Sequence, residues 1–192
     1  MGIKAVIFDL DGTVVENAYD WPKIRLELGN TEVSILHYIS GLEEPERSRK
    51  WAILERHETE QTARSVLREG MKELLTFLRE KGVRSALVTN NSLKNTEYLL
   101  GKFGLGFDRV ITRESGLWKP SGAPFREILD SFGVSPGECC VIGDTRFDIL
   151  AALDAGIGPI FLLADDPDDF AGFPVEVFPA IDSLTERLQE LL

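Results

Sequence analysis

The sequence contains only two cysteines, Cys139 and Cys140, which are adjacent and lie within an apolar run. This excludes a framework of disulfides, and no histidine flanks the pair at the spacing of a metal site. Because buried free cysteine behaves as a small hydrophobic side chain, we expect both to be core residues. A reducing compartment, namely the cytoplasm, is the expected location.

Basic residues and long apolar runs are also scarce. The chain carries 21 lysines and arginines against 32 acidic residues, which gives a formal net charge of −11. This charge opposes attraction to nucleic acid or to anionic lipid, so neither is an expected partner. No apolar run approaches the ~20 residues that span a bilayer, and the first residues lack the apolar segment of a signal peptide. We therefore expect a folded protein without a membrane segment.

Short apolar runs rich in β-branched residues alternate with helical patterns along most of the chain. This alternation predicts an α/β fold, a Rossmann-like parallel sheet core with helices on both faces. The predicted strands are 4–9, 83–90, 109–112, 139–144 and 159–164. The predicted helices include 71–78 before Gly82, 93–103 after Ser92, and 125–132 before Gly133.

One segment near the start interrupts this alternation, because it contains helical patterns and no strand pattern. We therefore predict an α/β core formed by residues 1–15 and 68–192, and a small α-helical insertion of residues 16–67. The predicted helices of the insertion are 21–28, 31–39 and 45–67, with Pro45 in the first turn of the last.

Acidic residues follow two of the predicted strands where each strand ends. Asp9 and Asp11 occur in DLDGT, and Asp144 and Asp148 occur in GDTRFD. Ligands gather at the carboxyl ends of parallel strands, so these carboxylates are expected to meet at one edge of the sheet. They would repel one another unless a cation lay among them, and an all-oxygen set without His or Cys favours Mg²⁺.

Other interpretations of the first acidic motif are weaker. An EF-hand needs glycine at its sixth position and glutamate at its twelfth, whereas here Gly12 is fourth and Asp20 is twelfth. A plain turn would also favour Asp and Gly. Because a second predicted strand, before GDTRFD, also ends in acids, a functional role explains the DLDGT motif better than a plain turn does.

Polar residues follow the strand predicted at 83–90. Thr89 and the backbone of Asn90, ahead of a helix capped by Ser92, suit phosphate oxygens. For Asn91 a functional role and a plain turn or cap role both stay open. Lys119, in GLWKPSG, is a candidate counter-charge for the acids.

The motifs DLDGT, TNN, the lysine of KP, and GDTRFD followed by ILAALDAG resemble, in this order, the four motifs of the haloacid dehalogenase superfamily of phosphatases. The insertion lies where phosphoglycolate phosphatases and β-phosphoglucomutases carry a helical cap, although it is shorter than their usual four-helix cap. The resemblance implies Mg²⁺-dependent hydrolysis of a small phosphorylated metabolite.

The resemblance also implies a role for each motif residue. Asp9 would be the nucleophile that forms an aspartyl-phosphate, and Asp11 the acid that protonates the leaving alcohol and then activates water. Gly12, Thr89, Asn90 and Lys119 would surround the phosphate. The implied metal residues are Asp9, Asp11, Asp144 and Asp148, the last acting either through water or by orienting Lys119.

A phosphomutase of the same fold is the nearest alternative, since it keeps both acids, but its relatives commonly carry Val or Ser where Thr13 stands. A non-catalytic binding protein would usually have lost a motif acid, and here all are present. The sequence leaves open the substrate and the choice between monomer and homodimer.

Residues outside the motifs carry weaker indications. In the insertion Lys23, Arg25 and Arg56 are candidate contacts for a substrate anion, although a solvated surface role competes. We interpret His37 and His57 as surface or packing residues and Trp118 as a candidate substrate wall.

Overall fold

The computed structural model of the chain describes residues 2–30 and 34–192. The chain divides into two compact units. We call Met1–Glu16 with Leu67–Leu192 the core unit, and Asn17–Val66 the helical unit. Among the described residues, no helix combines the length and the apolar character needed to cross a membrane.

The core unit is built on a parallel sheet with the strand order β5-β4-β1-β6-β7-β8. Each strand predicted from an apolar run is present, which confirms the predicted fold class. The edge strand β8 was not predicted, because its three residues are only half-buried and form no apolar run. The strands are β1 (Ala5–Phe8), β4 (Arg84–Val88), β5 (Arg109–Ile111), β6 (Cys139–Gly143), β7 (Ile160–Leu163) and β8 (Glu176–Phe178).

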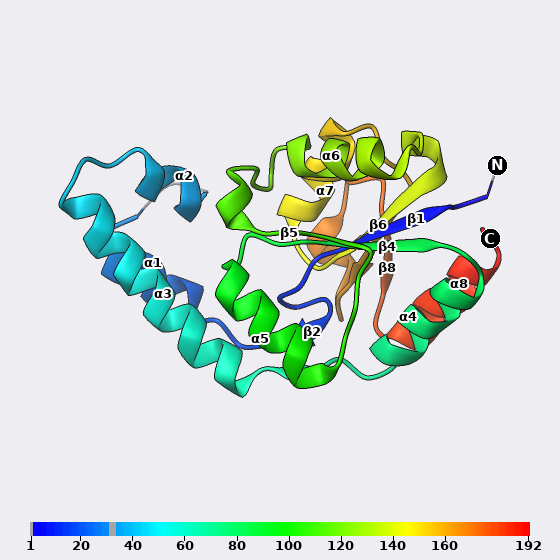
Figure 1. The fold of residues 1–192 in the computed structure, drawn as a ribbon, viewed down its shortest axis with the longest axis horizontal. Helices are drawn as coiled ribbons and strands as arrows, with labels where there is room; N and C mark the ends of the chain where they lie inside the picture. The colour runs from blue at the N-terminus through cyan, green and yellow to red at the C-terminus, as the bar shows by residue number, and fades with distance from the viewer. Residues whose placement is uncertain (1, 31–33) are drawn as a thin grey trace. The chain divides into compact units, whose positions relative to one another are not determined.

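Helices cover both faces of this sheet (Figure 1). Successive residues of a strand point to opposite faces, so Val6 and Phe8 pack under α4, α5 and α8, whereas Ala5 and Ile7 pack under α6 and α7. Cys139 and Cys140 are fully buried, as predicted. The helices are α4 (Met71–Glu80), α5 (Leu93–Phe103), α6 (Ala123–Phe132), α7 (Arg146–Asp154) and α8 (Ile181–Gln189).

The helical unit contains α1 (Trp21–Leu28), α2 (Ile35–Ser40) and α3 (Glu46–Arg64). Asp20 and Ser34 cap the first two, each side chain accepting a backbone N–H of the first turn. Ile24, Leu28 and Leu54 are buried where α1 packs on α3. Residues 31–33, which the sequence predicted as helix, lie outside the described residues.

The prediction of one helix over 45–67 was wrong at its end. Ser65 leaves the helical conformation, with φ −57° and ψ 140°, and β3 (Val66–Leu67) then pairs with β2 (Val15–Glu16). Pro45 precedes the first helical residue. A two-residue strand has no periodicity of its own, so its pairing could not be predicted from the sequence.

Candidate active site

The residues singled out by the motifs follow neighbouring strands of the core sheet. β4, β1 and β6 are adjacent, and the register sets Phe8 opposite both Leu87 and Ile142. The three strands therefore end level with one another. Asp9 and Asp144, which follow β1 and β6, consequently meet at the carboxyl edge of the sheet.

Lys119 is buried at this edge and bridges two acids. Its Nζ donates to Oδ1 of Asp9 and to Oδ1 of Asp148, at 2.6 Å in each case. The loop that carries the lysine is held by Asn90, whose side-chain oxygen accepts the Lys119 N–H at 3.0 Å and whose amide donates to the Lys119 carbonyl at 2.9 Å. The side chain of Asn90 therefore positions the lysine loop, and the placing of its backbone at the phosphate stays a prediction.

Asp144 lies against the turn that follows β1. The Thr13 hydroxyl donates to Oδ1 of Asp144 at 3.3 Å. A Cβ on Gly12 would collide with the same carboxylate, and Gly12 has φ +88°, a conformation that side chains disfavour. Glycine is thus required at position 12 both for the turn and for the approach of Asp144.

Asp148 is fully buried, and both of its oxygens are engaged. Oδ1 accepts from Lys119, while Oδ2 accepts the Thr145 N–H at 3.0 Å and the Thr145 hydroxyl at 2.8 Å. The second set of bonds is a capping box at the start of α7. Asp148 therefore contacts the lysine and caps a helix.

The acidic side chains at this edge outnumber the positive charge of Lys119. Oxygens of Asp9, Asp144 and Asp148 lie within 4.8 Å of one another; Asp11, a predicted metal residue, is outside this group among the described residues. Burial raises the pKa of Asp9 to about 7 against the opposing charge of Lys119. Burial, with the charges of Asp9 and Asp148, also holds the pKa of Asp144 well above its usual range.

The pKa of Lys119 is affected in two opposite directions. Burial lowers it, but the charges of Asp148 and Asp9 outweigh this effect and hold the pKa above its ordinary value. The lysine is therefore charged, and the acids offer the oxygen ligands that suit a divalent cation, whose charge would favour their ionised forms. The acidic group can thus bind a metal.

Asn91 links Asp11 to the end of β4. Its amide donates to Oδ2 of Asp11 at 2.9 Å, and its N–H donates to the buried Thr89 hydroxyl at 3.0 Å. Its side-chain oxygen accepts from the Ser92 N–H at 2.7 Å, at the start of α5. Asn91 therefore makes a local turn contact and also holds the carboxylate of Asp11, and its functional role stays a prediction.

Other candidates make local contacts. The indole N–H of Trp118 donates to the carbonyl of Arg113 at 2.7 Å. Within the helical unit, Glu27 pairs with Arg56 and accepts from His57 at 3.0 Å. His57, which the sequence predicted as a surface or packing residue, thus contacts an acid of its own unit, and the same acid engages Arg56.

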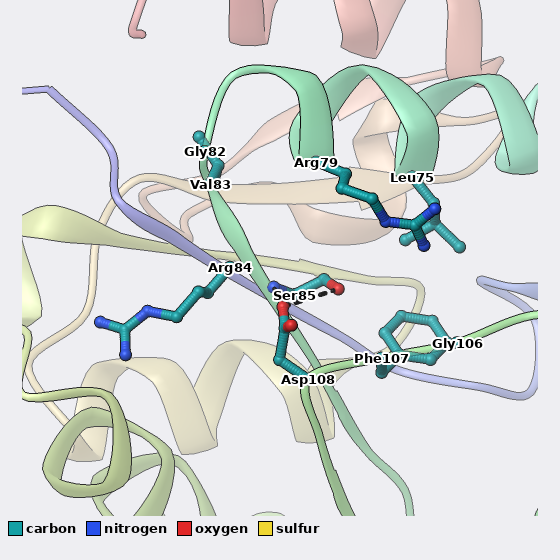
Figure 2. Close-up of a pocket in the computed structure, with 9 residues that line it drawn as sticks. All are labelled: Leu75, Arg79, Gly82, Val83, Arg84, Ser85, Gly106, Phe107 and Asp108. Atoms are coloured by element: carbon teal, nitrogen blue, oxygen red, sulfur yellow. Dashed lines mark hydrogen bonds between the residues drawn. The ribbon is translucent and has the colours of Figure 1, made fainter.

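A hollow of about 400 Å³ lies at the opposite, amino edge of the sheet (Figure 2). Among the described residues, Asp108 is the only acid that lines it, and its carboxylate points to Ser85, whose N–H donates to it at 2.8 Å. Arg84 donates to the carbonyl of Phe132 and lies over its ring, 4.4 Å from the centroid. This hollow therefore lacks the group of acids found at the carboxyl edge.

Comparison with known proteins agrees with this geometry. The chain is 26% identical over 207 residues to a haloacid dehalogenase-like hydrolase domain-containing protein of Arabidopsis thaliana, covering 99% of this chain and 84% of the relative. It is 27% identical over 187 residues to a phosphoglycolate phosphatase of Pseudomonas syringae pv. tomato, covering 83% of this chain and 69% of the relative.

A solved structure shares the fold. The crystal structure of CbbY from Rhodobacter sphaeroides in complex with phosphate has a TM-score of 0.72 and 23% identity, covering 95% of this chain and 96% of the other. The family model of the haloacid dehalogenase-like hydrolases matches residues 23–156. The predicted resemblance and the prediction of an enzyme are confirmed. The chain is therefore a member of the haloacid dehalogenase-like hydrolase family.

Proposed function

We propose that the protein is a Mg²⁺-dependent phosphatase that hydrolyses a small phosphorylated metabolite through an aspartyl-phosphate on Asp9. One observation carries this proposal: buried Lys119 bridges Asp9 and Asp148 at the carboxyl edge, beside Asp144. The relationship to phosphoglycolate phosphatases gives further support.

The metal would be held by Asp9 and Asp144. Asp148 already uses both oxygens, one on Lys119 and one on the first turn of α7, so we assign it to orientation of the lysine. When bound, Mg²⁺ supplies positive charge that offsets the repulsion between a carboxylate and a phosphate dianion.

In the proposed reaction an oxygen of Asp9 attacks phosphorus, and the bond from phosphorus to the leaving oxygen breaks. Asp11 gives its proton to that oxygen, so the alcohol leaves neutral. Water then attacks the aspartyl-phosphate while Asp11 takes its proton, which releases phosphate and restores Asp9. Lys119 and the end of β4, with Thr89 and Asn90, would bind the phosphate oxygens.

We also propose that the helical unit, predicted as residues 16–67, is the cap that selects the leaving group. Its helices carry exposed charged side chains that suit an anionic metabolite, among them Lys23. This assignment follows from the position of the insertion directly after the first motif.

Release of inorganic phosphate from a panel of phosphorylated metabolites and from p-nitrophenyl phosphate tests the proposal. We expect turnover with Mg²⁺ and none in EDTA. Full turnover without a divalent ion would remove the metal assignment. Trapping of a phosphorylated protein by rapid acid quench, absent in Asp9→Asn, would support the covalent step, and substantial turnover by that variant would exclude it.

A further inference from the structure

Arg68 binds the turn that carries Asp11. Its Nε donates to the carbonyl of Thr13 at 2.9 Å and its Nη2 to the carbonyl of Gly12 at 2.5 Å. Its backbone N–H donates to the carbonyl of Val14 at 3.1 Å. No motif of the sequence contains Arg68, so it was not among the predicted site residues.

Two side-chain bonds also tie the turn to other segments, from the Thr13 hydroxyl to Asp144 and from the Asn91 amide to Asp11, and several bonds are internal to it. The Gly12 N–H donates to the carbonyl of Val15 at 2.8 Å, and the N–H groups of Val14 and Val15 donate to the carbonyl of Leu10. These bonds fix the shape of the turn but not its direction relative to the rest of the site. The Arg68 guanidinium reaches the turn from a distant segment, 55 positions along the sequence from Thr13 and 56 from Gly12.

We propose that Arg68 is a positioning residue for Asp11, an inference that rests on the proposed function. Asn91 holds the carboxylate of Asp11, and Arg68 holds the backbone immediately after it. A general acid must lie within hydrogen-bond reach of the leaving oxygen, so a turn that moves by about 1 Å can lower the rate on the order of 100-fold. If Arg68 acts through Asp11, its removal should impair proton transfer to the leaving oxygen more than the other steps of the reaction.

Leaving groups of different basicity detect that defect. p-Nitrophenolate leaves without a proton, whereas unsubstituted phenolate needs one, and the two phosphates have similar size. For Arg68→Ala we expect kcat/KM to fall at least about tenfold more for phenyl phosphate than for p-nitrophenyl phosphate. With p-nitrophenyl phosphate, kcat should fall while kcat/KM is largely kept, because hydrolysis of the aspartyl-phosphate still needs Asp11 as base.

Three further variants make the comparison specific. Asp11→Asn should give the same pattern more strongly. Arg68→Lys, which keeps one donor, should restore part of the loss, as should guanidinium ion added to Arg68→Ala. Arg84→Ala is the matched control, since this arginine also donates to a backbone carbonyl but lies at the opposite edge of the sheet (Figure 2).

Circular dichroism and the Mg²⁺-induced rise in melting temperature report folding and the metal site separately from turnover. We expect both to be kept in Arg68→Lys and Arg68→Gln, which also replace Arg68→Ala if that variant does not fold. An equal fall for both phosphates, or a wild-type pattern in the Arg68 variants, overturns the inference alone. A wild-type protein without phosphatase activity overturns the proposed function, and the inference with it.

Discussion

Two ion pairs, one in the core unit and one in the helical unit, place charged side chains in opposite surroundings. At the carboxyl edge of the core sheet, Lys119 and Asp148 are buried and paired at 2.6 Å. In the helical unit, Arg47 pairs with Glu44 at 3.0 Å, with 43% and 50% of the two side chains exposed. Exposed pairs of this kind contribute roughly 0 to 1 kcal/mol, whereas burying charge carries a desolvation penalty of several kcal/mol per ion. The proposed chemistry, rather than stability, therefore explains why charged side chains are buried at the carboxyl edge.

The largest expected difference between the two units is seen when one acid is replaced in each of them. Asp9→Asn should lower kcat for p-nitrophenyl phosphate by at least about 10³-fold, because it removes the proposed nucleophile. Glu27→Gln in the helical unit should change it by less than about threefold, because it alters only a local pair. Steady-state kinetics with circular dichroism of both variants makes the measurement. Similar losses in the two variants would contradict the contrast.

Most substitutions of buried residues destabilise a protein, but replacing one of these buried acids should stabilise it. Asp144→Asn should raise the melting temperature of the metal-free protein, because burial and the neighbouring Asp9 disfavour its charge. The same variant should lose the stabilisation by Mg²⁺, which reaches about 2.7 kcal/mol in a binding-competent protein at 100 times Kd. Calorimetry in EDTA and in Mg²⁺ tests this. A metal response that survives in Asp144→Asn would exclude this residue as a ligand, and Glu46→Gln provides the exposed control.

Smaller and substrate-dependent effects are expected for the basic residues of the helical unit. Lys23→Ala or Arg25→Ala should lower kcat/KM for an anionic metabolite. The loss should correspond to about 1 to 3 kcal/mol of activation free energy, the range of a charged hydrogen bond, while kcat/KM for p-nitrophenyl phosphate stays unchanged. Arg56→Ala should have little effect because its guanidinium already pairs with Glu27. Uniform small effects on every substrate would assign these side chains to solvated surface.

The smallest effect is expected at Glu138, an acid of the core unit whose side chain is 14% exposed. The Lys4 ammonium, 2.5 Å away, together with the Ser135 N–H and hydroxyl, lowers the pKa of Glu138 to about 2 from 4.5. Its charge therefore stabilises the fold above pH 4.5, and this contribution is lost as pH falls toward about 2. Glu138→Gln should be slightly less stable than wild type at neutral pH, and urea unfolding should show the difference shrinking in acid. A constant difference would argue against this charge effect.

The sequence predicted the parts of the molecule that are continuous along the chain. β1 and β6 are unbroken apolar runs ending in acids, so both the strands and the meeting of Asp9 with Asp144 could be inferred. Contacts between segments that are distant along the chain could not be inferred from the sequence. The bonds from Arg68 to Gly12 and Thr13, and from Asn90 to the Lys119 loop, depend on how loops return to the sheet, for which residue type gives no signal.

The first turn of α7 has a consequence for heat tolerance. One carboxylate, that of Asp148, both caps this turn and holds Lys119. Helix ends open locally well before a domain unfolds as a whole. When this end opens, the ammonium loses one of its two anionic partners at the same moment. Inactivation on mild warming should therefore be reversible and should precede any loss of the sheet, because it begins in a single helical turn.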